Sequence, residues 1–144
     1  MALARDDVNL YSAGRDGQIN RWSTDSGKII KKFDNEHSGW IGQILLTKNG
    51  VHLYSAGNDK SIVQWRAEEG KALYKFEQKH KENIYTLALS PDEDFLFSGG
   101  GDNQILVWDL ESKNLLKKFV GHKGQIRDLV VDLDFKFFIS CSRD

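Results

Sequence analysis

Serine, histidine and aspartate recur along this sequence at repeating spacings, and together these residue types could perform nucleophilic hydrolysis. In four repeating units a serine stands four residues before an aspartate, and in the last three of these units a histidine stands 22 residues before that aspartate. In the first three units a tryptophan stands six residues after the aspartate. The residues concerned are Ser12, Asp16, Trp22, His37, Ser55, Asp59, Trp65, His80, Ser98, Asp102, Trp108, His122, Ser140 and Asp144.

The repetition itself argues against a catalytic triad. A nucleophilic serine needs an accessible hydroxyl, an oxyanion hole and a substrate pocket. An enzyme does not usually carry that machinery once in every repeat. Because the residues recur as a set, the sequence predicts a structural role for them and no enzymatic activity.

The repeat also predicts the secondary structure. Trp22, Trp65 and Trp108 stand 43 residues apart, and residues 10–22 agree with residues 53–65 at eight of thirteen positions. Apolar residues alternate with polar or small ones over short stretches between turn residues, which predicts strands. The expected strands are residues 41–46, 53–56, 62–65 and 72–76, then 84–89, 95–98, 105–108 and 115–120. The sequence therefore predicts an all-β protein with four antiparallel strands per unit.

Charge and composition narrow the function further. The 144 residues include 20 Lys and Arg against 21 Asp and Glu, so the formal net charge is −1. This balance disfavours nucleic acid as a partner.

No apolar run approaches the roughly 18 residues of a membrane helix, so no membrane partner is expected. The single cysteine, Cys141, cannot form an internal disulfide, which favours the cytoplasm, with the nucleus as the alternative, and the residue is expected to be buried.

No motif predicts a cofactor or a metal. The glycine-rich stretch 98–102 lacks the Gly-Lys-Ser/Thr ending of a phosphate-binding loop and leads into a strand, not a helix. The histidines that precede the aspartates lie 42 or 43 residues apart, one in each unit, and do not form a metal-binding spacing.

These features resemble the WD40 repeats of β-propellers. The resemblance is carried by the period, by the histidine before each first strand, and by the Asp-x5-Trp pattern that closes the third strand. Trp108-Asp109 supplies the dipeptide that gives the family its name, whereas Ser23 and Arg66 follow the other two tryptophans. The resemblance covers essentially the whole chain.

The resemblance implies β-propeller blades of four antiparallel strands, about three and a third repeats in an incomplete ring. The expected units are a partial blade over residues 1–36, blades over residues 37–79 and 80–121, and a partial blade over residues 122–144. It also implies a role for the recurring side chains in each blade: the aspartate holds the histidine, the histidine meets the serine hydroxyl, and the serine meets the indole N–H.

Both ends of the sequence fall within a blade. Met1-Ala2-Leu3-Ala4 matches the end of an inner strand, and residues 140–144 match the turn after a second strand. We expect a fragment of a longer propeller, or else several copies that complete a ring. A simple dimer is disfavoured because neither end supplies the strands that the other lacks.

The family resemblance implies a non-enzymatic scaffold that binds other proteins within a multi-subunit complex. The alternatives are an RNA- or chromatin-associated propeller subunit, which predicts a basic binding face, and the targeting module of a longer enzyme. In WD40 propellers the partner-facing rim is often built from residues three and five after the loop histidine and from the residue before the turn aspartate. Carried over, these positions give Trp40, Gly42, Asn58, Asn83, Tyr85, Gly101, Gln125, Arg127 and Arg143, with Arg15 in the first partial unit. Those with a side chain suited to binding a partner are Arg15, Trp40, Asn58, Asn83, Tyr85, Gln125, Arg127 and Arg143.

Overall fold

The computed structural model describes residues 2–3, 8–134 and 136–144, and within them all helical or extended elements are β-strands in four antiparallel sheets. The strands are β1 (Ala2–Leu3), β2 (Asn9–Ala13), β3 (Ile19–Ser23), β4 (Ile29–Lys32), β5 (Ile41–Leu46), β6 (His52–Gly57), β7 (Ile62–Arg66), β8 (Lys71–Lys75), β9 (Ile84–Leu89), β10 (Phe95–Gly100), β11 (Gln104–Asp109), β12 (Leu115–Val120), β13 (Ile126–Val131) and β14 (Phe138–Ser142).

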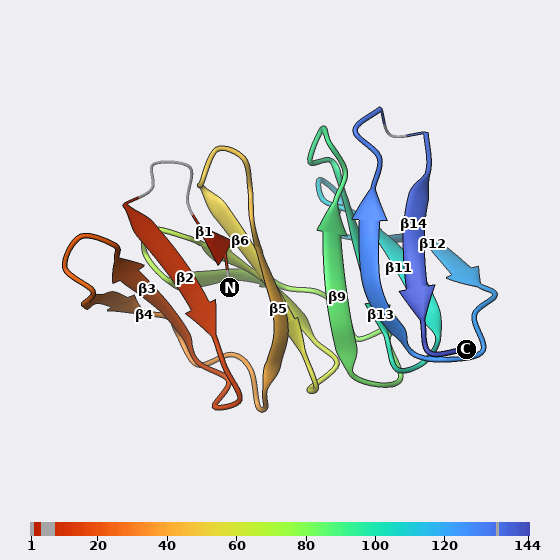
Figure 1. The fold of residues 1–144 in the computed structure, drawn as a ribbon, viewed down its shortest axis with the longest axis horizontal. Coiled ribbons are helices and arrows are strands. Elements are labelled where there is room, and N and C mark those ends of the chain that lie inside the picture. The colour runs from red at the N-terminus through yellow and green to blue at the C-terminus, as the bar shows by residue number, and fades with distance from the viewer. Residues whose placement is uncertain (1, 4–7, 135) are drawn as a thin grey trace.

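The sheets follow one another along the chain, and neighbouring strands in each sheet are also consecutive in sequence. The first three sheets have four strands each, and the fourth consists of β13 and β14 within the described residues. The first strands contact one another in the series β1, β5, β9 and β13, so they form the inner side of an arc (Figure 1). The outer strands β4, β8 and β12 are largely exposed.

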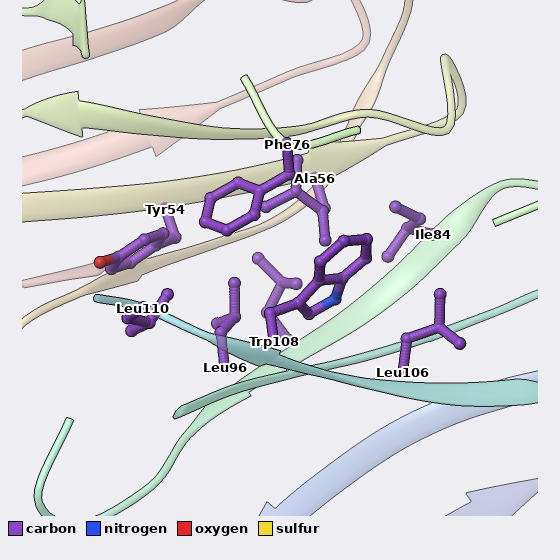
Figure 2. Close-up of a cluster of buried hydrophobic side chains, with 10 residues drawn as sticks. Tyr54, Ala56, Phe76, Ile84, Leu96, Leu106, Trp108 and Leu110 are labelled. Atoms are coloured by element: carbon purple, nitrogen blue, oxygen red, sulfur yellow. The ribbon is translucent and has the colours of Figure 1, made fainter. Parts of the chain in front are cut away.

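The hydrophobic core lies between successive sheets in three clusters. The first joins sheets one and two around Phe33 and Trp65, and the second joins sheets two and three around Phe76 and Trp108. Figure 2 shows the second cluster, in which side chains from both sheets meet. The central strands of sheets two and three are therefore buried on both faces. Each sheet depends on its neighbours for its stability, because apolar burial drives the packing.

One aromatic contact recurs at both of these interfaces. The rings of Phe33 and Trp65 have centroids 5.5 Å apart, and those of Phe76 and Trp108 are 5.6 Å apart. In each pair the phenylalanine directly follows the outer strand of one sheet and the tryptophan lies on the third strand of the next. Such pairs contribute about 0.5–1.5 kcal/mol beyond the burial of their area.

The turn after the second strand requires a left-handed residue in each of the first three sheets. Gly17, Lys60 and Asn103 occupy this position with φ values of 74°, 65° and 63°. Glycine adopts this conformation without a steric penalty, whereas most other residues pay for it. The repeat therefore keeps the turn geometry even where it does not keep glycine.

The observed strands coincide with the expected ranges 41–46, 84–89 and 115–120, and β10 extends two residues further than expected. The extension runs through Gly99 and Gly100, where the pairing register with β9 shifts. A Cβ atom on Gly99 would lie 2.6 Å from Ile126 Cγ2, and one on Gly100 would lie 2.4 Å from the Asn83 carbonyl oxygen. Glycine allows both neighbouring segments to approach this strand.

At the ends of the sequence, one expectation holds in part and one is wrong. Ala2 and Leu3 pair with β2 as the end of an inner strand, while Met1 and Ala4 lie outside the described residues. Cys141 was expected to be buried but is exposed. Ala56 at the equivalent position is buried between sheets two and three, whereas no sheet packs on that face of β14 among the described residues.

Replacing Phe76 by alanine tests the packing between sheets. Phe76 is 2% exposed, and its loss leaves a cavity beside Trp108. We expect the free energy of unfolding in urea to fall by about 3–5 kcal/mol. Leu73 on the adjacent strand is 43% exposed, so Leu73→Ala serves as the control, with an expected loss below about 1 kcal/mol. Equal losses in the two variants would show that this interface does not hold the sheets together.

Candidate functional site

The third sheet and the loop before it bring one complete set of the recurring side chains together. Trp108 Nε1 donates a hydrogen bond to Ser98 Oγ at 2.9 Å, and Ser98 Oγ lies 2.7 Å from His80 Nε2. His80 Nδ1 lies 3.0 Å from Asp102 Oδ2. The indole can only donate, so the serine hydroxyl donates to Nε2 and the proton on Nδ1 faces the carboxylate. Four polar groups are thereby satisfied in the interior.

The second sheet repeats this geometry. Trp65 Nε1 donates to Ser55 Oγ at 2.8 Å, Ser55 Oγ lies 2.6 Å from His37 Nε2, and His37 Nδ1 lies 2.9 Å from Asp59 Oδ2. The carboxylate of Asp59 also accepts the backbone N–H groups of Ser38 and Ser61. The network therefore joins the loop before the inner strand to the turn that follows the second strand.

The first and fourth sheets each hold part of the set. In the first sheet Trp22 Nε1 donates to Ser12 Oγ at 2.8 Å, and Asp16 accepts the backbone N–H of Gln18. In the fourth sheet His122 Nε2 lies 2.8 Å from Ser140 Oγ, and His122 Nδ1 lies 3.1 Å from Asp144. The first set has no histidine and the fourth has no tryptophan among the described residues.

Burial and hydrogen bonding act in opposite directions on the two central carboxyl groups. Burial alone would raise the pKa of Asp102, but the hydrogen bond and charge interaction with His80 and the N–H groups of Lys81 and Gln104 hold it below its ordinary value. The pKa of Asp59 is also lowered, because its hydrogen bonds with His37 and Ser61 outweigh the effect of burial. Both aspartates are therefore ionised in the folded protein, which stabilises the neighbouring imidazole N–H.

This arrangement does not provide a nucleophile. The Ser98 side chain is fully buried, and its hydroxyl accepts from Trp108 and donates to His80. The hydroxyl of Ser55 is engaged in the same way. A serine whose hydroxyl is enclosed and occupied has no access to a substrate. The chemical consequence of the network is to fix loops in place.

Two half-buried aromatic side chains and an exposed arginine lie in a stack across three sheets. The rings of Trp40 and Tyr85 have centroids 5.9 Å apart and an interplanar angle of 26°. The guanidinium carbon of Arg127 lies 4.2 Å from the centroid of the Tyr85 ring. We call Trp40, Tyr85 and Arg127 the aromatic stack. It lies at the start of the inner strands β5, β9 and β13, on the side of the arc that carries the histidine loops.

The other expected rim positions lie in the histidine loops and in the turns after the second strands. Three equivalent backbone hydrogen bonds tie each histidine loop to its neighbouring turn: Asn58 N to Trp40 O, Gly101 N to Asn83 O, and Arg143 N to Gln125 O. Arg127 also donates to the Gln125 side chain at 2.6 Å. Arg15 and Arg143 are exposed at the two ends of the arc. Whether these residues bind a partner stays a prediction.

A contact between the inner strands was not anticipated from the sequence. The side-chain oxygen of Gln43 on β5 accepts the backbone N–H of Leu87 on β9 at 2.8 Å, so it replaces a missing strand-to-strand bond between two sheets. The sequence offers one signal for this contact: Gln43 is a polar residue within an otherwise largely apolar inner strand.

Residues 2–3, 8–134 and 136–144 contain no group of three or more His, Cys, Asp or Glu side chains arranged to hold a metal ion. The same residues contain no helix with the length and apolar character needed to cross a membrane.

Four-stranded antiparallel sheets that pack face to face around a line of inner strands define this chain as an arc of a β-propeller. The sequence profile described as "WD domain, G-beta repeat" matches residues 27–66, 70–109 and 113–144, which is more than half of the chain. The chain belongs to the WD40 repeat family. Each matched segment begins before the outer strand of one sheet and continues into the next sheet.

Solved structures show the same fold. The chains described as "Structure of U3-55K" and "Crystal structure of RRP9 WD40 repeats" each align with a TM-score of 0.83 at 25% sequence identity. Each alignment covers 89% of this chain and 40% of the other chain, so this chain spans less than half of their length. No curated protein sequence is similar enough to this chain to count as a match.

Replacing Ser98 by alanine tests the cost of breaking the network. The Trp108 N–H and His80 Nε2 would both lose their partner in the interior, and unsatisfied buried groups cost about 1–3 kcal/mol each. We expect chemical denaturation to show a total loss of about 2–6 kcal/mol for the two groups together. Ser112 lies in an exposed turn and Ser112→Ala is the control. An unchanged midpoint for Ser98→Ala would contradict a stabilising role.

Replacing Asp102 by asparagine tests how much the negative charge of this residue contributes to the stability of the fold. The ordinary pKa of an aspartate carboxyl group is 3.8, and folding lowers the pKa of Asp102 below this value. Its ionised form therefore stabilises the folded state at any pH above 3.8, and this stabilisation is lost as the pH falls from 3.8 through the pKa of the folded state. We therefore expect the free energy of unfolding of the unmodified protein to fall more steeply between about pH 5 and pH 3 than that of Asp102→Asn. Parallel curves for the two proteins would show that Asp102 gains no stabilisation from ionisation.

Proposed function

We propose that this chain is part of a non-enzymatic WD40 scaffold that binds other proteins, within a multi-subunit complex, through the side of the arc that carries the histidine loops. The aromatic stack is the observation that carries this proposal. Trp, Tyr and Arg are the residue types enriched at the energetic centres of protein interfaces. Here one of each type lies on three successive sheets, anchored by loops that the buried networks hold in place.

The charges around the aromatic stack support a protein partner. The loops on this side carry basic residues, including Lys60, Lys81 and Lys123, but they also carry the exposed acidic residues Glu36 and Glu82. A binding site for RNA or chromatin would call for a basic face. The Tyr85 ring already stacks with Trp40 and lies under the Arg127 guanidinium, so these contacts compete with a stacked base for the ring.

The proposal extends to organisation and compartment. Repeat units over residues 37–79 and 80–121, flanked by partial units over residues 1–36 and 122–144, are the proposed domain boundaries. The exposed, unpaired Cys141 supports a reducing compartment, and we propose the cytoplasm.

Alanine variants of the aromatic stack test the binding face. Trp40→Ala, Tyr85→Ala and Arg127→Ala are each expected to weaken capture of a partner by roughly 30-fold, the equivalent of about 2 kcal/mol, because a hot-spot residue costs that much on truncation. Binding and the midpoint of thermal unfolding are measured for each variant. Leu73 is 43% exposed on the outer strand β8, so Leu73→Ala is the control and should bind normally. Lower stability with binding retained would assign the stack to packing alone.

A further inference from the structure

The residue five positions after each loop histidine forms a β-bulge at the start of an inner strand. Gly42 in β5, Tyr85 in β9 and Arg127 in β13 each lie where the pairing with the second strand of the sheet skips one residue. A bulge residue is left out of the regular ladder, and the bulge re-aims its side chain. The bulges therefore aim Tyr85 and Arg127 of the aromatic stack, and ladder pairing within their own sheets does not fix them.

Contacts between neighbouring sheets must therefore hold the aromatic stack. β5 and β9 belong to separate sheets, yet β9 runs beside β5 (Figure 1). A Cβ atom on Gly42 would lie 2.8 Å from the Ile84 carbonyl oxygen and 3.1 Å from the Trp40 ring. No side chain fits between the two strands at this point, so glycine permits their close approach.

Next to Gly42, the side chain of Gln43 crosses from β5 to β9. Its Oε1 accepts the backbone N–H of Leu87 at 2.8 Å. Leu87 is 1% exposed, so its N–H is closed to water and needs an acceptor within the protein. The bond holds the buried middle of β9 against β5, two residues beyond the Tyr85 bulge.

The same repeat position in the other sheets shows why glutamine suits this role. Thr86 and Asp128 stand six residues after their histidines, as Gln43 does. Asp128 Oδ1 accepts the backbone N–H of Leu129 at 2.9 Å, and Leu129 is the equivalent of Leu87. The aspartate side chain is one methylene shorter than that of glutamine, and it bonds to its own strand. In β13 the equivalent N–H is therefore satisfied without a bond from the neighbouring sheet.

We propose that Gln43 is a positioning residue of the aromatic stack. Its amide oxygen holds β9 against β5, which keeps the Tyr85 ring 5.9 Å from the Trp40 ring and under the Arg127 guanidinium. This role deepens the proposed function and rests on it for its biological meaning, because a stack that is already positioned lowers the entropic cost of binding a partner.

NMR measures the geometry of the aromatic stack without a partner. The ring current of the Trp40 indole shifts the resonances of protons that lie over its face, so the Tyr85 ring protons report on the stacking. Tyr85→Phe identifies these signals among those of the four tyrosines, and Trp40→Ala gives their position without the indole. The difference between the unmodified 144-residue chain and Trp40→Ala is the ring-current shift of the stack.

Substitutions of Gln43 test its role. Gln43→Met keeps the length of the side chain but removes the acceptor, and we expect it to lose most of the ring-current shift. Gln43→Glu keeps an oxygen acceptor and should retain most of the shift. Gln64→Met is the matched control, because it removes a different glutamine hydrogen bond of the same sheet, from Nε2 to the Tyr54 hydroxyl at 3.1 Å, and leaves the stack untouched.

The pattern of shifts decides between positioning and stability alone. Loss of the shift in Gln43→Met, with the shift retained in Gln43→Glu and Gln64→Met, supports the proposal. An unchanged shift in Gln43→Met would overturn it, and so would an equal loss in Gln43→Glu or Gln64→Met. If Gln43→Met does not fold, Gln43→Asn gives the same decision, because its amide is one methylene too short to reach Leu87. No partner is involved, so overturning this role would leave the proposed function standing.

Discussion

An indole N–H buried between two sheets must find an acceptor, and in this fold that need sets the position of four separate elements. The acceptor is a serine on the second strand, whose own proton goes to a histidine in the preceding loop, which in turn faces an aspartate in the following turn. Each group satisfies the next, so none of them is left unpaired in the interior. The indole ring also packs on the phenylalanine of the neighbouring sheet, so a local hydrogen-bond network fixes the packing between sheets as well.

The same network bears on the proposed binding side of the arc. The histidine loop is held by the aspartate side chain and by a backbone bond to the next turn, such as Asn58 N to Trp40 O at 3.0 Å. Residues just after the histidine, including Trp40 and Tyr85, therefore start from an ordered backbone. A partner that binds there does not have to order the loops first, which lowers the entropic cost of association.

The sequence predicted the parts of the structure that depend on local pattern. Strands such as β9 and β12 follow from alternation between turn residues, and the regular spacing of Ser98, Asp102 and Trp108 pointed to a shared structural role. The stacking of Arg127 on Tyr85 could not be predicted, because it depends on how two sheets approach each other. The exposure of Cys141 was missed for a related reason: burial of a strand residue is decided by the sheet that packs on its face, which the residue's own neighbours in sequence do not reveal.

The sequence repeat and the sheet are out of phase by one strand, and this offset bears on how such a chain can change in length. All three matched segments start before an outer strand, and the first two end with the third strand of the next sheet, as residues 27–66 do from β4 to β7. Duplication or deletion of one such unit by recombination would leave every internal sheet with four strands and would move the incomplete sheets to the ends. A repeat array of this kind can gain or lose units without creating a defect in its interior, so its length is free to vary while each internal interface keeps its paired aromatic rings.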